Sequence, residues 1–449
     1  MKRISYLNLA LISVLISSCN GDDAALPDNT VNLSATELGL EDTESSKEFT
    51  VNIDRSSTTA TTVVFDVSTS DLTYDTDFTT TPAISNNQLS VVIPAGETSA
   101  TVVVTKQEDA LFDGDETLTF TFKSVSTGIV QGSKLSLALS FSAIVSEGEE
   151  LTLNGGEGGS SAVNSVFVDF SNNEQTSVAR KSWNLGFYSG DDFAVILNNT
   201  TSSTAMKVDN LSVSDIISST DSATYAAQIA LNYTDKFAYL DDLNGDLSET
   251  VIKEGNVYVV NLGESQTPLY KVKVTEKDAD TYTLQYAKSN EAVVTTIEVA
   301  KDTSYNFVYT SFAEGKVVSV EPAKAKWDIE WTKNISSAST GTSSIPYSIS
   351  DFVLINSRAG TTVATVTISS EVTYENFALA NLSTVEFSSD MNHIGSTWRS
   401  TNPATGVKTD RFYVIQDSAG NAYKLRFLKM GVADDGTRGY PQIEYALLK

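Results

Sequence analysis

Few side chains in this chain of 449 residues could act as a nucleophile, a general base or a soft metal ligand. It has one histidine, His393, one cysteine, Cys19, and four methionines. Pairs of the Ser-His or Cys-His kind would therefore share a single possible base. No Gly-x-Ser-x-Gly or His-Glu-x-x-His motif occurs. Its 57 acids leave open the carboxylate pair of a glycosidase, but no context marks one. We expect a protein that is not an enzyme.

The chemistry that the chain supplies in quantity is that of carboxylates. Asp and Glu number 57 against 30 Lys and Arg, which gives a formal net charge of −27. Nucleic acids and anionic lipid surfaces attract proteins with Lys and Arg patches. The charge therefore excludes nucleic acid as an expected partner and favours a body kept in solution by its own repulsion.

Cys19 has a special place because it follows a secretory signal peptide. The chain opens with Lys2 and Arg3, continues with an apolar stretch over residues 7–16, and closes this segment with two serines. The stretch is too short to span a membrane as a helix, and its layout is that of a signal peptide over residues 1–18. We expect lipoprotein processing to acylate Cys19.

Residues 19–31 are expected to form an acidic tether between the lipid anchor and the first domain. The segment begins CNGDD, and two acids soon after a lipidated cysteine resemble the surface-export signal of Bacteroidetes lipoproteins. The resemblance implies a protein held in the outer membrane by its lipid and facing the cell exterior. The alternative is a plain disordered tether, which implies the anchor without the surface address.

Residues 32–145 show the alternation of β-strands. Stretches such as TLTFTF (117–122) and LSLALSF (135–141) have apolar residues at every second position, which is typical of half-buried strands. Turn signals built from Gly, Pro and Asp recur about every ten residues. This spacing predicts a β-sandwich of about seven strands.

The order of features in this first domain resembles a Calx-β domain. The features are IDR (53–55), YDTDF (74–78), IPAGET (93–98) and, most specific, QED with FDGDE between residues 107 and 116. The resemblance covers residues 33–143. The calcium-binding acids that it implies are Asp77, Asp109, Asp113, Asp115 and Glu116. Such carboxylates repel one another unless a cation lies between them, and Ca²⁺ takes oxygen ligands from flexible loops. The alternative is surface charge beside turns.

Residues 146–449 are predicted to form a second domain that contains two copies of one element. WNLGFY (183–188) and WDIEWT (327–332) each begin with tryptophan and alternate apolar with polar residues. Each is followed by an apolar strand that ends in asparagine, FAVILN (193–198) in one copy and FVLIN (352–356) in the other. The alternation indicates β-strands in both copies.

Two details of the second domain are predicted from the same pattern. Trp183 and Trp327 are expected to be core residues on the same face of their strands as Leu185 and Ile329. The stretch YAAQIAL (225–231) breaks the strand pattern and predicts a short helix. The second domain is therefore expected to be all-β with a short helical insertion.

This second domain resembles the HmuY family of haem-binding lipoproteins. The stretches that carry the resemblance are VEP (320–322), WDIEWT (327–332), RFYVI (411–415), GNAYKL (420–425) and GYP (439–441). It spans residues 151–449 and implies an antiparallel β-fold whose two hairpin-like projections clamp haem for delivery to an uptake receptor. The predicted fold class is mainly β, a seven-stranded sandwich followed by an all-β HmuY-like domain.

The axial haem ligands that this resemblance implies come from a small set. Haem iron accepts His or Met from opposite faces, and His393 is the single histidine. Met391 lies two residues earlier, so in an extended segment both side chains point the same way, about 6.6 Å apart. A second ligand then comes from elsewhere: Met206 is the best placed and Met430 is weaker. The alternative is that the methionines fill cores and His393 is a solvated loop residue.

The scarcity of histidine also allows a different function on the same fold. A surface adhesion module could keep the clamp, bind no haem, and recognise a glycan or a protein instead. Trp398 and Tyr347 lie near segments rich in Ser, Thr and Asn, and they would be its exposed aromatic contacts. The two functions share the fold and the location and differ in the ligand.

Overall fold

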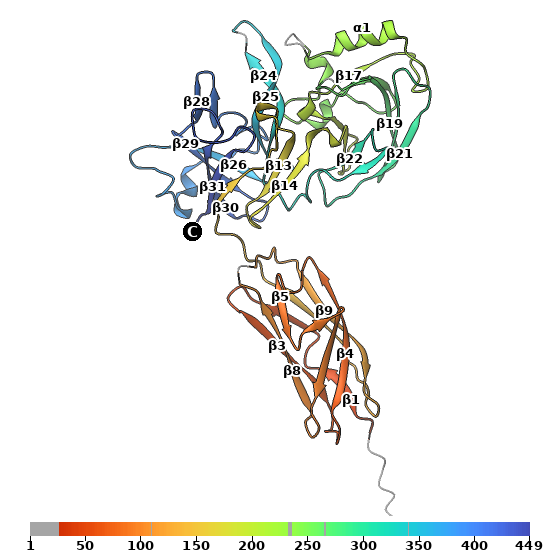
Figure 1. The fold of residues 1–449 in the computed structure, drawn as a ribbon, viewed down its shortest axis with the longest axis vertical. Helices are drawn as coiled ribbons and strands as arrows, with labels where there is room; N and C mark the ends of the chain where they lie inside the picture. The colour runs from red at the N-terminus through yellow and green to blue at the C-terminus, as the bar shows by residue number, and fades with distance from the viewer. Residues whose placement is uncertain (1–26, 109, 232–235, 265, 340) are drawn as a thin grey trace, which may run out of the picture. The chain divides into compact units, whose positions relative to one another are not determined.

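The chain folds into β-sheets with one short α-helix among the residues described, as a computed structural model shows (Figure 1). The structure describes residues 27–449 except 109, 232–235, 265 and 340. The chain divides into two units, Met1–Ala143 and Ile144–Lys449, two residues before the predicted boundary. The signal peptide, Cys19 and most of the tether lie outside the described residues. The mainly β fold class is confirmed.

Unit 1, red to orange in Figure 1, contains two sheets. Phe49 of one sheet and Phe120 of the other pack together with ring centroids 5.1 Å apart. The strands of one sheet, in spatial order, are β10 (Val130–Gln131), β1 (Thr30–Leu33), β3 (Ser46–Ile53), β8 (Ser99–Lys106) and β5 (Phe78–Thr81). Those of the other are β2 (Glu37–Leu40), β11 (Ser136–Phe141), β9 (Thr117–Val125), β4 (Thr61–Ser70), β7 (Gln88–Ile93) and β6 (Ile84–Ser85). Alternate residues such as Leu118 and Phe120 are fully buried.

The described part of unit 1 has eleven strands where the sequence predicts seven. The additional strands have two to four residues and lie at or near the sheet margins. Short edge strands leave few backbone groups open to pairing with another chain. A strand of two residues has no period, so the sequence pattern could not reveal it.

Unit 2 is built from two repeats, each with a four-stranded and a five-stranded sheet. In the first repeat, the four-stranded sheet has the order β16 (Val195–Leu197), β15 (Leu185–Tyr188), β22 (Phe307–Ser311) and β23 (Lys316–Val318). Its five-stranded sheet has the order β17 (Thr204–Lys207), β18 (Val257–Asn261), β19 (Tyr270–Asp278), β20 (Thr281–Lys288) and β21 (Thr295–Ala300). In the second repeat, the four-stranded sheet has the order β25 (Ser344–Ile355), β24 (Ile329–Ser339), β13 (Asn164–Asp169) and β14 (Glu174–Ala179). Its five-stranded sheet has the order β26 (Thr362–Thr367), β29 (Arg411–Gln416), β30 (Ala422–Lys429), β31 (Gln442–Leu447) and β12 (Glu150–Thr152). The second repeat thus takes β12 to β14 from the start of the unit, so it is a circular permutation of the first.

The same hydrogen bonds recur at equivalent positions of the two repeats. The side-chain oxygen of Asn184 accepts a hydrogen bond from the backbone N–H of Phe312 at 2.7 Å. The side-chain oxygen of Asp328 accepts a hydrogen bond from the backbone N–H of Phe170 at 2.8 Å. In both repeats the polar residue after the tryptophan therefore binds the backbone where the neighbouring strand ends, which satisfies a buried donor.

The asparagine that ends the second strand of each copy also has one role in both repeats. Asn198 Nδ2 donates to the backbone carbonyl of Trp183 at 2.9 Å, and Asn356 Nδ2 donates to that of Trp327 at 2.9 Å. Each asparagine is 1% exposed, so its amide holds the segment before the tryptophan-led strand in place. The copies seen in the sequence are therefore copies in structure.

Trp183 and Trp327 are buried, but they do not lie on the predicted face. Leu185 packs in the core of the first repeat, whereas Trp183 packs in a separate cluster with Tyr309. Ile329 packs in the core of the second repeat, and Trp327 lines a cavity described below. The reason is local: β15 and β24 begin two residues after the tryptophans, so the alternation of the strand does not extend back to them.

The predicted helical insertion is α1 (Ser219–Ile229). Its first turn is capped by Ser218, whose hydroxyl oxygen accepts a hydrogen bond from the backbone N–H of Asp221 at 3.1 Å. Ile229 is fully buried at its last turn. Among the residues described, no helix has the length and apolar character needed to span a membrane.

Two hairpins extend from the body of unit 2 in Figure 1. One is the outer part of β24–β25, beyond the irregularity between Thr332 and Asn334. The other joins β27 (Arg399–Thr401) and β28 (Ala404–Val407). They correspond in kind to the two projections that the family resemblance implies.

Candidate functional site

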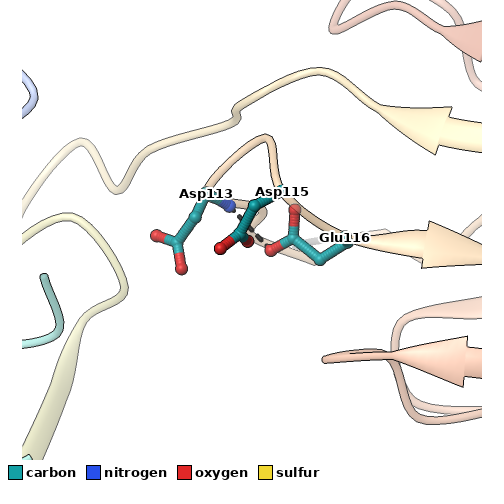
Figure 2. Close-up of side chains that lie close together, drawn as sticks. All are labelled: Asp113, Asp115 and Glu116. Carbon is teal, nitrogen blue, oxygen red and sulfur yellow. Dashed lines mark hydrogen bonds between the residues drawn. The ribbon is translucent and has the colours of Figure 1, made fainter. Parts of the chain in front are cut away.

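Three acids of unit 1 gather on the turn that leads into β9, as Figure 2 shows. Ligand oxygens of Asp113, Asp115 and Glu116 all lie within 4.8 Å of one another. Glu116 is 4% exposed and accepts hydrogen bonds from the backbone N–H groups of Asp113 (2.7 Å) and Gly114 (2.9 Å). Burial raises the pKa of Glu116. A divalent cation would offset both this burial and the repulsion among the carboxylates, so these residues fit Ca²⁺.

The other two acids of the predicted calcium set are placed differently. Asp109 lies outside the described residues. Asp77 accepts a hydrogen bond from the backbone N–H of Thr73 at 2.6 Å, so its carboxylate stabilises its own turn. Asp71, which the sequence pattern did not single out, adds a repulsion to the burial that raises the pKa of Glu116. The structure thus brings three of the predicted acids together and adds Asp71 to their surroundings.

His393 and Met391 lie in the segment before β27. The Nε2 atom of His393 is 2.9 Å from the Thr365 hydroxyl of β26, and the imidazole is half-buried. The Met391 carbonyl accepts a hydrogen bond from the backbone N–H of Ile355 at 3.0 Å. An iron bound to His393 would therefore use Nδ1 or displace the hydrogen bond to Thr365.

Met206 lies in the other repeat. It belongs to β17 and packs against an apolar cluster that contains Ile229 and Val259, under helix α1. Met430 is 1% exposed and belongs to the core of the second repeat. The structure therefore places Met206 in the first repeat and His393 beside β26 of the second repeat, and their pairing as axial ligands stays a prediction.

Neither projecting hairpin contains a histidine, methionine or cysteine. No His, Met or Cys occurs in residues 329–355 or in residues 399–407. The outer part of β24–β25 is rich in Ser, and its large apolar side chains include Tyr347, which is 42% exposed. The hairpins can offer a surface to a flat ligand, but an axial His or Met has to come from elsewhere in the unit.

Trp398 is not the exposed aromatic contact that the sequence suggests. It is 1% exposed. Its ring stacks on Phe427 with centroids 4.1 Å apart, and its Nε1 donates to the backbone carbonyl of Asp351 at 3.1 Å. The Ser and Thr around it in the sequence led to the wrong prediction, because the loop turns this one side chain inward. Of the two predicted aromatic contacts, only Tyr347 is exposed.

A cavity of about 140 Å³ lies between the two repeats, and the sequence analysis did not predict it. Equivalent aromatic pairs form part of its lining. Trp183 packs edge-on against Tyr309, with centroids 4.8 Å apart and ring planes at 73°. Trp327 packs in the same way against Phe167, at 5.1 Å and 78°. The cavity thus lies where the four-stranded sheets of the two repeats face each other.

Carboxylates also line this cavity: Glu321 and Asp241 are buried, and Glu330 is half-buried. Burial raises the pKa of Glu321 to about 7, that of Glu330 to about 7, and that of Asp241 to about 6. Such shifts in a concave site mark a candidate for ligand binding. Glu330 occupies the polar position in WDIEWT, so the signal was present, but the alternation alone suggested that it faces solvent.

Comparisons with solved structures give matches of low identity and low TM-score. The apo form of the Calx CBD1 domain is 13% identical, with 26% of this chain and 96% of that chain covered and a TM-score of 0.22. The calcium-binding domain CBD12 of CALX1.1 is 10% identical, with 33% and 73% covered and a TM-score of 0.22. A two-domain protein of unknown function from Bacteroides fragilis is 14% identical, with 40% and 68% covered and a TM-score of 0.20. No curated protein matches the chain.

A family model matches the part of unit 2 that holds the second tryptophan-led strand and both projecting hairpins. The matched residues begin before β22 and end within β31. They lie inside the region 151–449 for which the resemblance is predicted. The resemblance to the HmuY family is confirmed for this part of the chain, because residues 303–445 match the family described as HmuY protein.

Proposed function

We propose that this chain is a non-catalytic surface lipoprotein that binds haem through unit 2 and delivers it to an uptake receptor. It is anchored in the outer membrane through Cys19 and faces the cell exterior. The observation that carries the proposal is the match of residues 303–445 to the HmuY family. The signal peptide and the CNGDD segment support the location.

The side chains present fit a haem with one imidazole ligand. His393 is half-buried, and imidazole is a common axial ligand of haem iron. Met206 packs in the first repeat and Met430 in the core of the second. When bound, haem supplies a redox-active iron, and the chain's own part is to hold and cover the ring.

A titration of the mature chain with hemin tests this proposal. We expect a saturable Soret band at micromolar hemin, because a protein imidazole that binds iron changes the absorption of the porphyrin. Hemin in serum-free buffer alone controls for the aggregation of hemin. Hemin mixed with a chain whose unit 2 is unfolded controls for non-specific adsorption. A spectrum that stays that of free hemin would rule the proposal out.

The second candidate function is a surface adhesion module that binds a glycan or a protein and no haem. The observation that favours it is the lack of His, Met and Cys in both hairpins, together with the exposed Tyr347. Aromatic rings on an exposed hairpin suit contact with a sugar or a protein. Loss of partner binding on Tyr347→Ala, in a chain that gives no Soret band, would support it.

We also propose that unit 1 binds Ca²⁺ through Asp113, Asp115 and Glu116. Millimolar Ca²⁺ is expected to raise the melting temperature of unit 1, because a ligand that binds the folded state at about five times Kd stabilises it by about 1 kcal/mol. EDTA should reverse the shift, and Glu116→Gln should abolish it. Glu97→Gln, a change at an exposed acid of the same unit, should keep it. An equal shift in both variants would contradict the assignment.

A further inference from the structure

We propose that the cavity between the two repeats of unit 2 is a separate binding site for a small organic ammonium ion that carries a hydrogen-bond acceptor. The site is distinct from the haem proposal because it does not use His393, although Met391, one of the predicted axial ligands, is among its lining residues. It is built from the inner faces of the two four-stranded sheets and is closed by a loop of the first repeat. Four features of its lining point to this class of ligand.

The first feature is the pair of aromatic walls. Trp183 with Tyr309 and Trp327 with Phe167 present two edge-on aromatic pairs, one from each repeat, to the same cavity. The faces of such rings attract organic cations, and the attraction grows when the site excludes water. Trp183 and Trp327 are 7% and 8% exposed, so water is largely kept from these walls.

The second feature is an excess of acidic over basic side chains. The described lining residues include five carboxylates and one guanidinium, namely Asp241, Asp242, Asp246, Glu321, Glu330 and Arg358. Several of these acids already bind the backbone. Asp241 accepts hydrogen bonds from the N–H groups of Leu197 (2.7 Å) and Val251 (2.8 Å), and Glu321 accepts one from that of Phe307 (2.7 Å). The hydrogen bonds of these acids to the backbone stabilise the lining of the cavity. A cationic ligand needs a carboxylate that is not bound to the backbone.

Glu330 is that acid. It lies on β24 opposite Phe167 of β13, and the groups that lower the pKa of its carboxyl are the nearby hydroxyls of Ser165 and Thr332, with no backbone N–H among them. These hydroxyls also bind each other at 2.6 Å, so they can turn away from Glu330 when a stronger donor arrives. Burial raises the pKa of Glu330 to about 7. A cation beside the carboxylate would offset this desolvation.

The third feature is a buried donor that lacks an acceptor. The Nε1 atom of Trp327 has no hydrogen-bond partner among the described residues, and the residue lines the cavity. A buried N–H of this kind destabilises the fold unless it finds an acceptor. A ligand with a hydroxyl or ether oxygen next to its ammonium group would satisfy Trp327 and Glu330 together.

The fourth feature is the size and closure of the site. A volume of about 140 Å³ holds on the order of ten water-sized groups, which suits a molecule like choline and is several times too small for a porphyrin. The mouth is closed by Arg358, which donates to the backbone carbonyl of Gly245, and by Asn392, whose Nδ2 donates to that of Leu243 at 2.8 Å. Residues of the second repeat thus hold a loop of the first repeat over the site.

Isothermal titration of the full mature chain with choline, compared with 3,3-dimethylbutan-1-ol, tests the proposal. The alcohol has the same shape and hydroxyl but a carbon in place of the charged nitrogen. We expect choline to bind and the alcohol to bind about tenfold more weakly or worse, because the cation–aromatic and carboxylate attractions are lost. Equal affinity of the two compounds would overturn the assignment to ammonium ions, and the absence of heat with both would overturn the site itself.

Glu330→Gln, which keeps the shape and removes the charge, should weaken choline binding by about tenfold or more. Glu174→Gln, a change at an exposed acid of β14 in the same repeat, should leave it unchanged. Unchanged choline binding in a folded Glu330→Gln chain would overturn the role of Glu330. If that variant does not fold, the comparison of choline with the alcohol on the natural chain still decides. Hemin binding, followed in parallel, should not respond to choline.

Discussion

Trp398→Ala is expected to lower the free energy of unfolding of unit 2 by about 3–5 kcal/mol, which is typical of the removal of a large buried aromatic side chain. The residue is 1% exposed and stacks on Phe427 with ring planes at 19°. Its Nε1 also holds the backbone of Asp351, at the base of the long β24–β25 hairpin. The substitution removes apolar contacts and leaves a buried carbonyl without its donor.

Chemical denaturation followed by circular dichroism measures this change. Tyr347→Ala is the matched control, because this ring is 42% exposed and its removal should change stability by no more than about 0.5 kcal/mol. The sequence-based alternative assigned ligand contact to both aromatics. A Trp398→Ala chain that unfolds at the same denaturant concentration as the natural chain, but no longer binds its partner, would contradict the structure and restore that alternative.

Glu264→Gln is expected to destabilise unit 2 by about 3 kcal/mol at neutral pH, because it leaves a buried cation without its counter-charge. Glu264 Oε1 lies 2.8 Å from Nη1 of Arg180, which is 3% exposed, and 2.9 Å from Nζ of Lys333. Partial burial acts to raise the pKa of Glu264, but the hydrogen bonds and charges of Arg180 and Lys333 outweigh it and lower the pKa to about 2.

The pH dependence follows from the direction of that shift. A carboxyl with a lowered folded pKa stabilises the fold fully above its unfolded pKa of about 4.5, and this stabilisation is lost as the pH falls towards 2. Glu264→Gln and the natural chain should therefore differ most at pH 6–8 and converge in acid. Glu298→Gln, which breaks the exposed pair with Lys277, should lose no more than about 1 kcal/mol. Equal losses for both variants would show that burial does not strengthen the Glu264 contacts.

The strand content of both units could be predicted from the sequence because apolar and polar residues alternate within it. The repeat in unit 2 could be predicted as well, since Trp183 and Trp327 each begin such a strand and an asparagine ends the next one. No local pattern in the sequence shows that β12 to β14, from the start of the unit, complete the two sheets of the second repeat. Glu150 pairs with Glu444 across nearly the whole unit, and such long-range pairing leaves no periodic trace in the sequence.

The candidate sites were predicted less well, for a related reason. Asp113, Asp115 and Glu116 are neighbours along the chain, so their meeting follows from one turn. The cavity instead needs Glu330, Trp183 and Asp241 from three distant segments. Residue type and spacing gave the polarity of each side chain, but the approach of the two repeats decides which of them face each other.

The measurement that tests the central claim most directly is the absorption spectrum of the hemin-loaded mature chain, in the ferric and ferrous states, for three proteins. These are the natural chain, His393→Ala and Met206→Leu. We predict a saturable Soret band in the natural chain and its loss or shift in His393→Ala. A shift in Met206→Leu would identify Met206 as the second axial ligand, and an unchanged spectrum would leave that place to another side chain. A natural chain whose spectrum remains that of free hemin would contradict haem binding and turn the search towards glycan and protein ligands of the same fold.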